Sequence, residues 1–419
     1  MSNDDAQPGA PDARQAASRQ SQTHVASLWL ILRESCRAFS ANNSMQTAAT
    51  LAFYGFRSLM PLLLLCIYTL SVFMMSSDAI LDGMKEATAR IFPSFSDALL
   101  TDLFKLSRQK SLGVVSFAVV VWSMSPFTGA FRVAFARIFK AQKQMSYVKT
   151  TLFDMGTILA LLAFLVLMVV GNMLYGILFP QATRLATVVK SFTLLVLTLG
   201  VLMTFARAFS PIRLRASLLF TGALVGTLLL AAMRPLFELM LRYNPSYGYA
   251  FGSLKAIFIL VVWVYFTFAV LLFSTEVMAA AWRKDVLVLR GILSGVPRQS
   301  RATAILLERF VRECLPGEVL FHEGDPGGGM FYILTGSVDL TKGDRPLRTM
   351  GPGEYFGEMS MLLGAARTAT AAAGADTRLV TIDQENFETI LRENPQVVMA
   401  LLKEMAERLK ATSNQLRPK

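Results

Sequence analysis

Residues 356–369 read FGEMSMLLGAARTA, and this stretch carries the densest chemical pattern in the chain. The guanidinium of Arg367 can hold a phosphate group with two parallel N–H donors, and free N–H groups at the start of a short helix would add partial positive charge. The carboxylate of Glu358 can accept a hydrogen bond from a sugar hydroxyl. Small residues let the backbone approach a ligand closely. We therefore predict a site for a cyclic phosphodiester, formed by Phe356, Gly357, Glu358, Met359, Ser360, Arg367, Thr368 and Ala369.

The sequence around this stretch has the pattern of an antiparallel β-roll. Short apolar runs alternate with Gly, Pro and Asp turns, as in LPGEVLF at 315–321, MFYILTGSV at 330–338 and GPGEYFGE at 351–358. With Glu358 and Arg367, these runs resemble the cyclic-nucleotide-binding domain of catabolite activator proteins, protein kinase regulatory regions and nucleotide-gated channels. The resemblance covers roughly residues 300–413. It implies a C-terminal jelly-roll with flanking helices and a regulatory ligand, cAMP or cGMP.

A roll of this kind can also persist as a docking module after its ligand site has been lost. Such domains usually lose the arginine or the glutamate first, and both Glu358 and Arg367 are present. The sequence therefore favours a working ligand site. Thr368 could hydrogen-bond a guanine amino group, but related cAMP-gated channels also carry threonine there. This residue does not choose between the two nucleotides, and a bacterial setting favours cAMP.

The last helix is the second candidate part of the site. Asn394-Pro395 separates two helices, and residues 396–411 place Val398, Leu402, Met405 and Leu409 on one apolar stripe. The resemblance implies that this helix closes over the purine as a lid. Alternatively, it packs on its own roll or on a partner subunit of a homo-oligomer. The candidate lid residues are Leu402, Lys403, Met405 and Arg408.

The chain before this domain is strongly apolar. Of the 419 residues, 53% are hydrophobic and 17% are charged, and the mean hydropathy is +0.47. The long apolar runs fall between residues 45 and 285, and about 20 apolar residues are enough to cross a bilayer. We predict an α-helical polytopic membrane domain with about six spans, at 47–75, 111–131, 151–178, 187–210, 215–241 and 250–282.

These features divide the chain into four parts. Residues 1–27 are rich in Gln, Ser, Ala and Asp, lack the apolar segment of a signal peptide and are predicted to be disordered. The membrane domain covers 28–285, and a linker covers 286–299. The nucleotide-binding domain covers 300–419.

Basic residues are concentrated in the short links between the predicted spans. The segments 129–150 and 205–216 carry several Lys and Arg and no acid, and the positive-inside rule places such links in the cytoplasm. With an even number of spans, both termini are then cytoplasmic, in the inner (plasma) membrane of a bacterium. The net charge of +12 is explained by this topology and by the lipid bilayer as partner, so we predict no nucleic-acid partner.

Residues that carry enzyme chemistry are scarce. The chain has 2 His and 3 Cys, and the cysteines lie in different regions, which argues against a His-rich metal site and a disulfide framework. No nucleophile, metal cluster or acid–base pair is evident. We predict that the protein binds no metal and is not an enzyme.

The membrane half has its own resemblance. The stretch NNSMQTAATLAFYGFRSLMPLL at 42–63 and the stretch SYGYAFGSL at 246–254, with Trp263, Tyr265 and Glu276 beyond it, resemble the YihY/BrkB membrane-protein family. The resemblance covers roughly residues 28–285 and implies transport of lipids or other envelope components. Asn42-Asn43 departs from the family, which often carries an acid there.

Ionisable residues inside the predicted spans are candidate functional groups, because charge is costly in a bilayer. Arg57, Asp154, Arg207 and Glu276 all fall toward the cytoplasmic side. We predict that they form a polar cluster lining a cavity. Alternatively, they make structural ion pairs or reach the headgroups.

Two functions follow from these expectations. The first is a transporter or flippase-like protein with an unknown substrate, regulated by cyclic nucleotide binding to its cytoplasmic domain. The alternative is a non-transporting membrane-anchored sensor or scaffold that recruits partners when the nucleotide level rises.

Overall fold

The computed structural model describes residues 13–73, 112–141, 184–243, 255–293 and 301–415, together with Phe153, Gly156, Leu159, Ala160 and Ala163. The chain forms two compact units. One unit is Glu34–Ala281. The other unit combines Met1–Arg33 with Trp282–Lys419, so it contains both ends of the chain.

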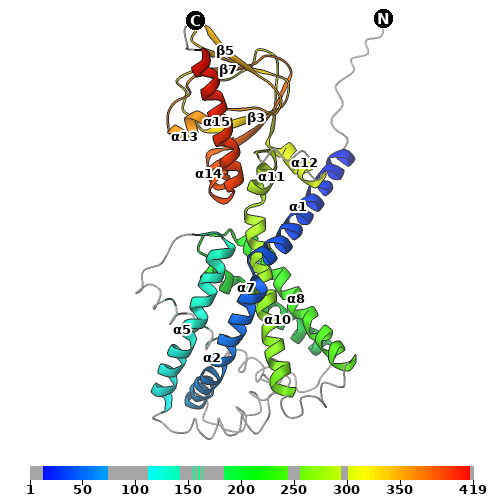
Figure 1. Ribbon diagram of the computed structural model, residues 1–419. Coiled ribbons are helices and arrows are strands. Elements are labelled where there is room, and N and C mark those ends of the chain that lie inside the picture. The colour runs from blue at the N-terminus through cyan, green and yellow to red at the C-terminus, as the bar shows by residue number, and fades with distance from the viewer. Residues whose placement is uncertain are drawn as a thin grey trace, which may run out of the picture. The chain divides into compact units, whose positions relative to one another are not determined.

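The first unit is built from long helices (Figure 1). They are α2 (Ser44–Phe73), α5 (Leu112–Ile138), α7 (Arg184–Phe209), α8 (Ala216–Tyr243) and α10 (Lys255–Trp282), preceded by the end of α1 (Ala13–Ala41). These five helices coincide with five of the six predicted spans. The sixth prediction, 151–178, lies outside the described residues apart from the five isolated positions, which are helical.

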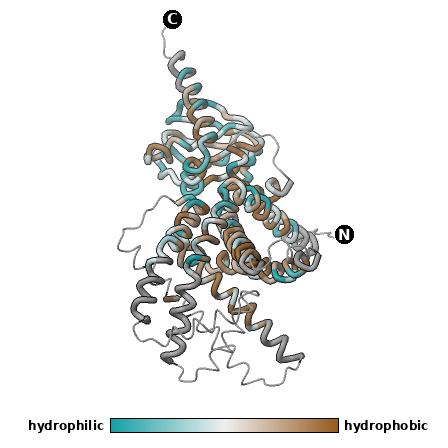
Figure 2. The backbone as a smooth tube through the Cα atoms, turned by 60° about the horizontal axis from the view of Figure 1, so that its bottom comes forward, coloured by the Kyte–Doolittle hydropathy of each residue, from teal (hydrophilic) through white to brown (hydrophobic). Residues whose placement is uncertain are grey.

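Three of these helices contain a stretch long and apolar enough to cross a membrane: Phe192–Phe209, Ala216–Leu239 and Phe258–Trp282. Large apolar side chains such as Phe192, Leu228 and Leu236 point outward from them, as expected for helices surrounded by lipid. Figure 2 shows the contrast in hydropathy between long hydrophobic stretches in these helices and the mixed pattern of the roll. The expected class, an apolar helical region followed by a β-roll, is confirmed.

Aromatic rings fill the centre of the helical unit. Phe131 and Phe135 of α5 are fully buried, and the ring of Phe131 lies 4.8 Å from that of Phe205 in α7. Helices α8 and α10 approach closely because Gly222 has no side chain. A Cβ atom at Gly222 would lie 2.1 Å from Cγ of Met278.

The C-terminal unit contains the roll. Its strands are β1 (Val311–Cys314), β2 (Val319–Phe321), β3 (Gly329–Thr335), β4 (Val338–Lys342), β5 (Arg345–Met350), β6 (Tyr355–Phe356), β7 (Thr370–Ala373) and β8 (Thr377–Asp383). They form two four-stranded sheets with the orders β1-β8-β3-β6 and β2-β7-β4-β5. All strand pairs are antiparallel. Ile333, Val338 and Leu379 are fully buried in the core of the roll.

Short helices flank the strands. They are α11 (Lys284–Leu293), α12 (Arg301–Leu307), the 3-10 turn η2 (Glu308–Phe310), α13 (Glu358–Leu363), α14 (Gln384–Glu393) and α15 (Pro395–Gln415). Asp383 caps α14 because its carboxylate accepts a hydrogen bond from the backbone N–H of Asn386 at 2.7 Å. Helix α13 begins directly after β6, which is an edge strand of its sheet. Helix α13 therefore lies at that edge.

The prediction that residues 1–27 are disordered is wrong from Ala13 onward, because α1 begins there. The segment is rich in Ala, Gln and Arg, which favour helix. Ala26 is buried and Leu30 is partly buried in the core of the C-terminal unit. These two residues are four apart, so they share one face of the helix, and tertiary packing of that face stabilises the segment.

The first half of the linker predicted at 286–299 is helical and packs in the core of the C-terminal unit. Residues 284–293 form α11, in which Val286, Val288, Leu289, Ile292 and Leu293 are buried. The apolar residues of α11 follow the last predicted span in the sequence, but they pack in the core of the C-terminal unit. The rest of the predicted linker lies outside the described residues.

The apolar stripe predicted for the last helix is displaced by one residue. Val397 and Leu401 of α15 are 1% and 6% exposed, whereas Leu402 is 55% exposed. Apolar side chains occur at both sets of positions, so the sequence allows either face. Packing against Phe387 and Ile390 of α14 selects the face that carries Val397 and Leu401.

Candidate functional site

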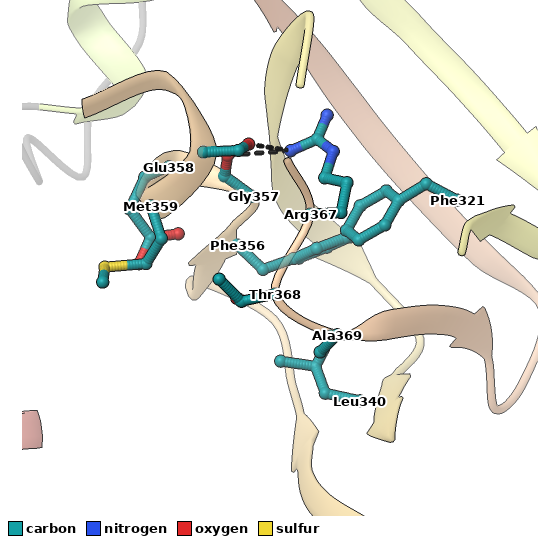
Figure 3. Close-up of a pocket in the computed structure, with 10 residues that line it drawn as sticks. Phe321, Leu340, Phe356, Gly357, Glu358, Met359, Arg367, Thr368 and Ala369 are labelled. Carbon is teal, nitrogen blue, oxygen red and sulfur yellow. Dashed lines mark hydrogen bonds between the residues drawn. The ribbon is translucent and has the colours of Figure 1, made fainter. Parts of the chain in front are cut away.

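A pocket opens where β6, α13 and the segment before β7 meet (Figure 3). The structure brings all eight predicted ligand residues to its wall. Two further side chains, Phe321 from β2 and Leu340 from β4, complete the lining. The full lining is Phe321, Leu340, Phe356, Gly357, Glu358, Met359, Ser360, Arg367, Thr368 and Ala369.

Gly357 sets the geometry of the turn into α13. Its φ of 80° is in the left-handed region, and a Cβ atom there would lie 2.5 Å from Nη1 of Arg367. A side chain would therefore be strained and would also collide with the guanidinium. Gly364 ends the helix in the same left-handed region, with φ of 61°, so the chain turns back and delivers Arg367 to the start of α13.

Arg367 is the centre of the site. Its Nη1 donates to the carbonyl oxygen of Gly357 at 2.8 Å and to Oγ of Ser360 at 2.9 Å, and its Nη2 donates to the carbonyl oxygen of Gly329 at 2.6 Å. The guanidinium lies over the ring of Phe321, 4.2 Å from its centroid. Arg367 is only 6% exposed. Within the described residues its buried Nε has no hydrogen-bond acceptor.

The charge on Arg367 is therefore poorly compensated. Burial lowers the pKa of Arg367, and the negative charges of Asp325 and Glu358 oppose that effect. Arginine nevertheless remains protonated in proteins. The hydrogen-bond acceptors of Arg367 that the structure gives are neutral oxygens, so an anion such as a phosphate would stabilise this buried cation.

The pocket also has an apolar and aromatic wall. The rings of Phe331 and Phe356 stack with centroids 5.3 Å apart, and Phe321 lies 5.9 Å from Phe331. Leu340 and Ala369 extend this surface. A flat purine or a sugar can pack against such a wall while its phosphate faces Arg367.

Sequence reasoning missed Phe321 and Leu340. Leu340 reaches the pocket because β4 pairs with β7, with Leu340 opposite Ala371. Phe321 reaches it because β2 pairs with the other side of β7. The sequence shows that Phe321 and Leu340 are apolar residues within predicted strand regions, but it does not show the register of these strands against β7.

The predicted lid is not at the pocket. Among the α15 side chains that the structure describes, none lines it. Leu402 and Lys403 are exposed and Met405 is half-buried, and the side chain of Arg408 lies outside the described set. The buried face of α15 is directed at α14, so the same rotation of the helix that displaces the stripe also leaves these residues away from the site.

The residues of the predicted membrane cluster lie in different environments. Glu276 is fully buried, and its Oε1 accepts hydrogen bonds from Nδ2 of Asn42 at 2.7 Å and from Oγ of Ser44 at 3.4 Å. Arg57 and Arg207 are exposed. The guanidinium of Arg57 lies near the rings of Tyr54 and Trp122, 5.5 and 5.9 Å from their centroids. Asp154 lies outside the described residues.

The structure gives Glu276 a buried contact across a long sequence separation. Asn42, at the turn between α1 and α2, holds the carboxylate of Glu276 near the end of α10. The backbone carbonyl of Asn42 also accepts a hydrogen bond from Nη1 of Arg137 at 3.3 Å. In the parts of the chain that the structure describes, no group of three or more His, Cys, Asp or Glu is placed to hold a metal ion.

The apolar helices, together with a pocket whose buried arginine can bind a phosphate, define a membrane protein with a cyclic-nucleotide-binding domain. Comparison with known families agrees: the cyclic nucleotide-binding domain matches residues 311–394, and the family described as virulence factor BrkB matches residues 35–288. The chain therefore belongs to the BrkB family. Both resemblances noted in the sequence are confirmed.

Characterised relatives match the C-terminal domain. A CRP-like cAMP-activated global transcriptional regulator of Mycobacterium tuberculosis is 30% identical over 138 residues, covering 32% of this chain and 61% of the relative. The cyclic AMP receptor protein of Thermus thermophilus is 34% identical over 118 residues, covering 27% and 55%. A cyclic nucleotide-gated potassium channel of Rhizobium etli is 28% identical over 122 residues, covering 28% and 34%.

Among solved structures, the catabolite activator protein of Thermus thermophilus matches with 29% identity and a TM-score of 0.26, covering 30% of this chain and 61% of that chain. In each of these matches the chain spans less than two thirds of the relative's length. The similarity therefore concerns the domain rather than whole proteins.

Proposed function

We propose that this protein is a bacterial inner-membrane transporter or flippase-like protein regulated by cAMP, which binds in the pocket of the roll. The single observation that carries the nucleotide part is Arg367, a buried cation in a pocket with an aromatic wall, whose acceptors given by the structure are neutral and whose Nε–H has no acceptor among the described residues. The proposal assigns no catalytic activity to the chain. It places both termini in the cytoplasm, where the nucleotide is available.

The choice of cAMP over cGMP rests on the relatives. The Mycobacterium tuberculosis relative is named a cAMP-activated regulator and the Thermus thermophilus relative a cyclic AMP receptor protein. In this proposal the phosphate faces Arg367, the ribose hydroxyl faces Glu358 and the purine packs on the wall formed by Phe321, Phe356 and Leu340.

Calorimetric titration of the full-length protein in nanodiscs tests nucleotide binding, with cAMP, cGMP and non-cyclic AMP as ligands. We expect saturable binding of cAMP and tighter binding of cAMP than of cGMP. Because a hydrogen bond to a charged group contributes about 1.5–3 kcal/mol, Arg367→Gln should weaken cAMP binding by about tenfold or more.

Arg312→Gln is the matched control, because Arg312 makes an exposed ion pair with Glu318 at 2.7 Å and is not part of the pocket lining. It should bind cAMP like the parent protein. Thermal unfolding of the same samples separates loss of affinity from loss of fold. Absence of binding at millimolar nucleotide, or normal binding by a folded Arg367→Gln variant, would refute the receptor assignment.

Reconstitution into liposomes tests the transport part. Movement of labelled phospholipids and flux of small anions are measured with and without cAMP, and with Arg367→Gln as the nucleotide-blind control. Transport predicts movement that depends on cAMP in the parent protein alone. If neither lipid nor anion moves, the transport assignment is refuted and the receptor assignment stands.

A membrane-anchored sensor that transports nothing is the second candidate. It is favoured by the different environments of Arg57, Arg207 and Glu276, because a transport pathway needs polar groups that converge on one cavity. A chimera in which unrelated helices replace the span-forming segments distinguishes the two. A sensor keeps its cAMP-dependent cellular effect in the chimera, and a transporter loses it.

A further inference from the structure

The hydrophobic core of the C-terminal unit contains the segments that join it to the membrane helices. Ala26 and Leu30 belong to α1, which leads into α2, and Leu289 and Ile292 belong to α11, which follows α10. All four pack in one cluster with Ile390 of α14 and its neighbours. Figure 1 shows α11 beside α14 within this unit. Residues of α1, which precedes α2, and of α11, which follows α10, are therefore part of the core of the C-terminal unit.

Helix α13 connects this core to the pocket. Met359 and Ser360 line the pocket, whereas Met361 packs in the buried cluster that contains α11 and α14. The same division occurs one element earlier, where Phe356 lines the pocket and Tyr355 lies in the cluster. A ligand that contacts one face of α13 thus acts on an element whose other face belongs to this core. Since packed cores shift between discrete arrangements rather than deform continuously, such a contact can bias the whole cluster.

A buried ion pair lies within the C-terminal unit, one residue beyond the end of α10. Nη1 of Arg283 lies 3.4 Å from Oε2 of Glu393, and the two side chains are 7% and 10% exposed. Arg283 is the single residue between Trp282, which ends α10, and Lys284, which begins α11, while Glu393 ends α14. Breaking a buried ion pair by removing one partner typically costs about 3–5 kcal/mol. The pair therefore fixes the residue that follows α10 against the end of α14.

We propose that Arg283 and Glu393 form a latch through which nucleotide occupancy is coupled to the end of α10. The inference rests on the proposed nucleotide-binding function and adds its route of regulation. Arg283 and Glu393 act as positioning residues, because neither lines the pocket. Coupling between two sites is reciprocal. If bound cAMP changes the stability of the ion pair between Arg283 and Glu393, then the ion pair in turn changes the affinity for cAMP. Removing the pair should therefore change the Kd for cAMP.

The first experiment measures cAMP affinity of the full-length protein in nanodiscs by calorimetry. The decisive variant is the double substitution Arg283→Met with Glu393→Leu, because replacing a buried ion pair by apolar residues usually preserves the fold. We expect its Kd for cAMP to change by at least about fivefold, the lower end of typical allosteric coupling. The exchanged pair, Arg283→Glu with Glu393→Arg, should return toward the parent value, and Arg312→Gln should match it. A smaller change in the folded double variant overturns the proposal.

The second experiment follows hydrogen exchange on adding cAMP. In the parent protein, exchange should change both in the pocket segment 356–369 and in α11, whereas in the double variant only the pocket segment should respond. If the pocket segment responds in the parent protein but α11 does not, the latch is refuted and the receptor assignment stands. If the parent protein binds neither cAMP nor cGMP, the receptor assignment itself fails and the latch fails with it.

Discussion

The geometry around Arg367 depends on a single glycine. Gly357 has a left-handed backbone conformation. The Cβ atom of any other residue at this position would lie 2.5 Å from Nη1 of Arg367. Gly353 has a similar φ of 91° but nothing within 4 Å of its Cβ position. A substitution at Gly353 therefore adds backbone strain alone, whereas a substitution at Gly357 adds backbone strain and displaces Arg367.

Gly357→Ala and Gly353→Ala should differ in their effect on the ligand. Both should lower stability, by about 1–2 kcal/mol for the left-handed conformation. Gly357→Ala should also weaken cAMP binding severalfold, because the new methyl group displaces the guanidinium, and Gly353→Ala should leave the affinity unchanged. Thermal unfolding and calorimetric titration measure the two effects. Equal cAMP affinity in the two variants would show that this glycine does not position Arg367.

At the level of single elements, α15 shows how packing selects one face of an amphipathic helix. Leu401 is 6% exposed and packs in the cluster with α14, whereas its neighbour Leu402 is 55% exposed. Leu401→Ala should therefore lower the free energy of unfolding by about 2–5 kcal/mol. Leu402→Ala should change it by less than about 0.5 kcal/mol. Chemical denaturation of the full chain measures both, and the reverse order would mean that the other face is buried.

The contact between α8 and α10 gives a second prediction at this level. Gly222→Ala would place a methyl group 2.1 Å from Cγ of buried Met278, so we expect a loss of about 1–3 kcal/mol from overpacking. Gly200→Ala is the control, because its Cβ would have nothing within 4 Å and alanine favours helix by about 1 kcal/mol. Melting temperatures in detergent should fall for the first variant alone. A fall in both would mean that the effect is not local to this contact.

At the scale of the whole molecule, the C-terminal unit is assembled from both ends of the chain. A fragment that starts at residue 301 retains the roll but lacks α11 and α1, and so exposes Phe387 and Ile390, which are 1% and 0% exposed in the full chain. We expect a lower melting temperature for this fragment than for one that starts at residue 283, because the longer fragment restores α11 and the pair between Arg283 and Glu393.

Adding a peptide that spans residues 13–33 should stabilise the longer fragment further, since Ala26 and Leu30 pack in the same cluster. Differential scanning calorimetry of the two fragments, with and without the peptide, measures each contribution. Identical melting temperatures for the two fragments would show that α11 is not an integral part of the domain.

The sequence by itself determined the features that depend on local order and on composition. Glu358 and Arg367 are close together in the chain. The six-residue helix α13, flanked by the left-handed Gly357 and Gly364, is enough to bring both residues to one pocket. The apolar runs likewise determined five long helices, since burial in lipid depends on the hydropathy of each segment. Both family resemblances therefore follow from the order of residues along the chain.

Only the tertiary structure decided which surfaces meet. Hydropathy indicates that a side chain is buried but not what buries it, so it could not distinguish a linker from α11 or select between Leu401 and Leu402. The register of β4 against β7 brought Leu340 to the pocket, and packing across 234 positions joined Asn42 to Glu276. These contacts depend on the simultaneous packing of segments far apart in the chain, and no local pattern encodes them.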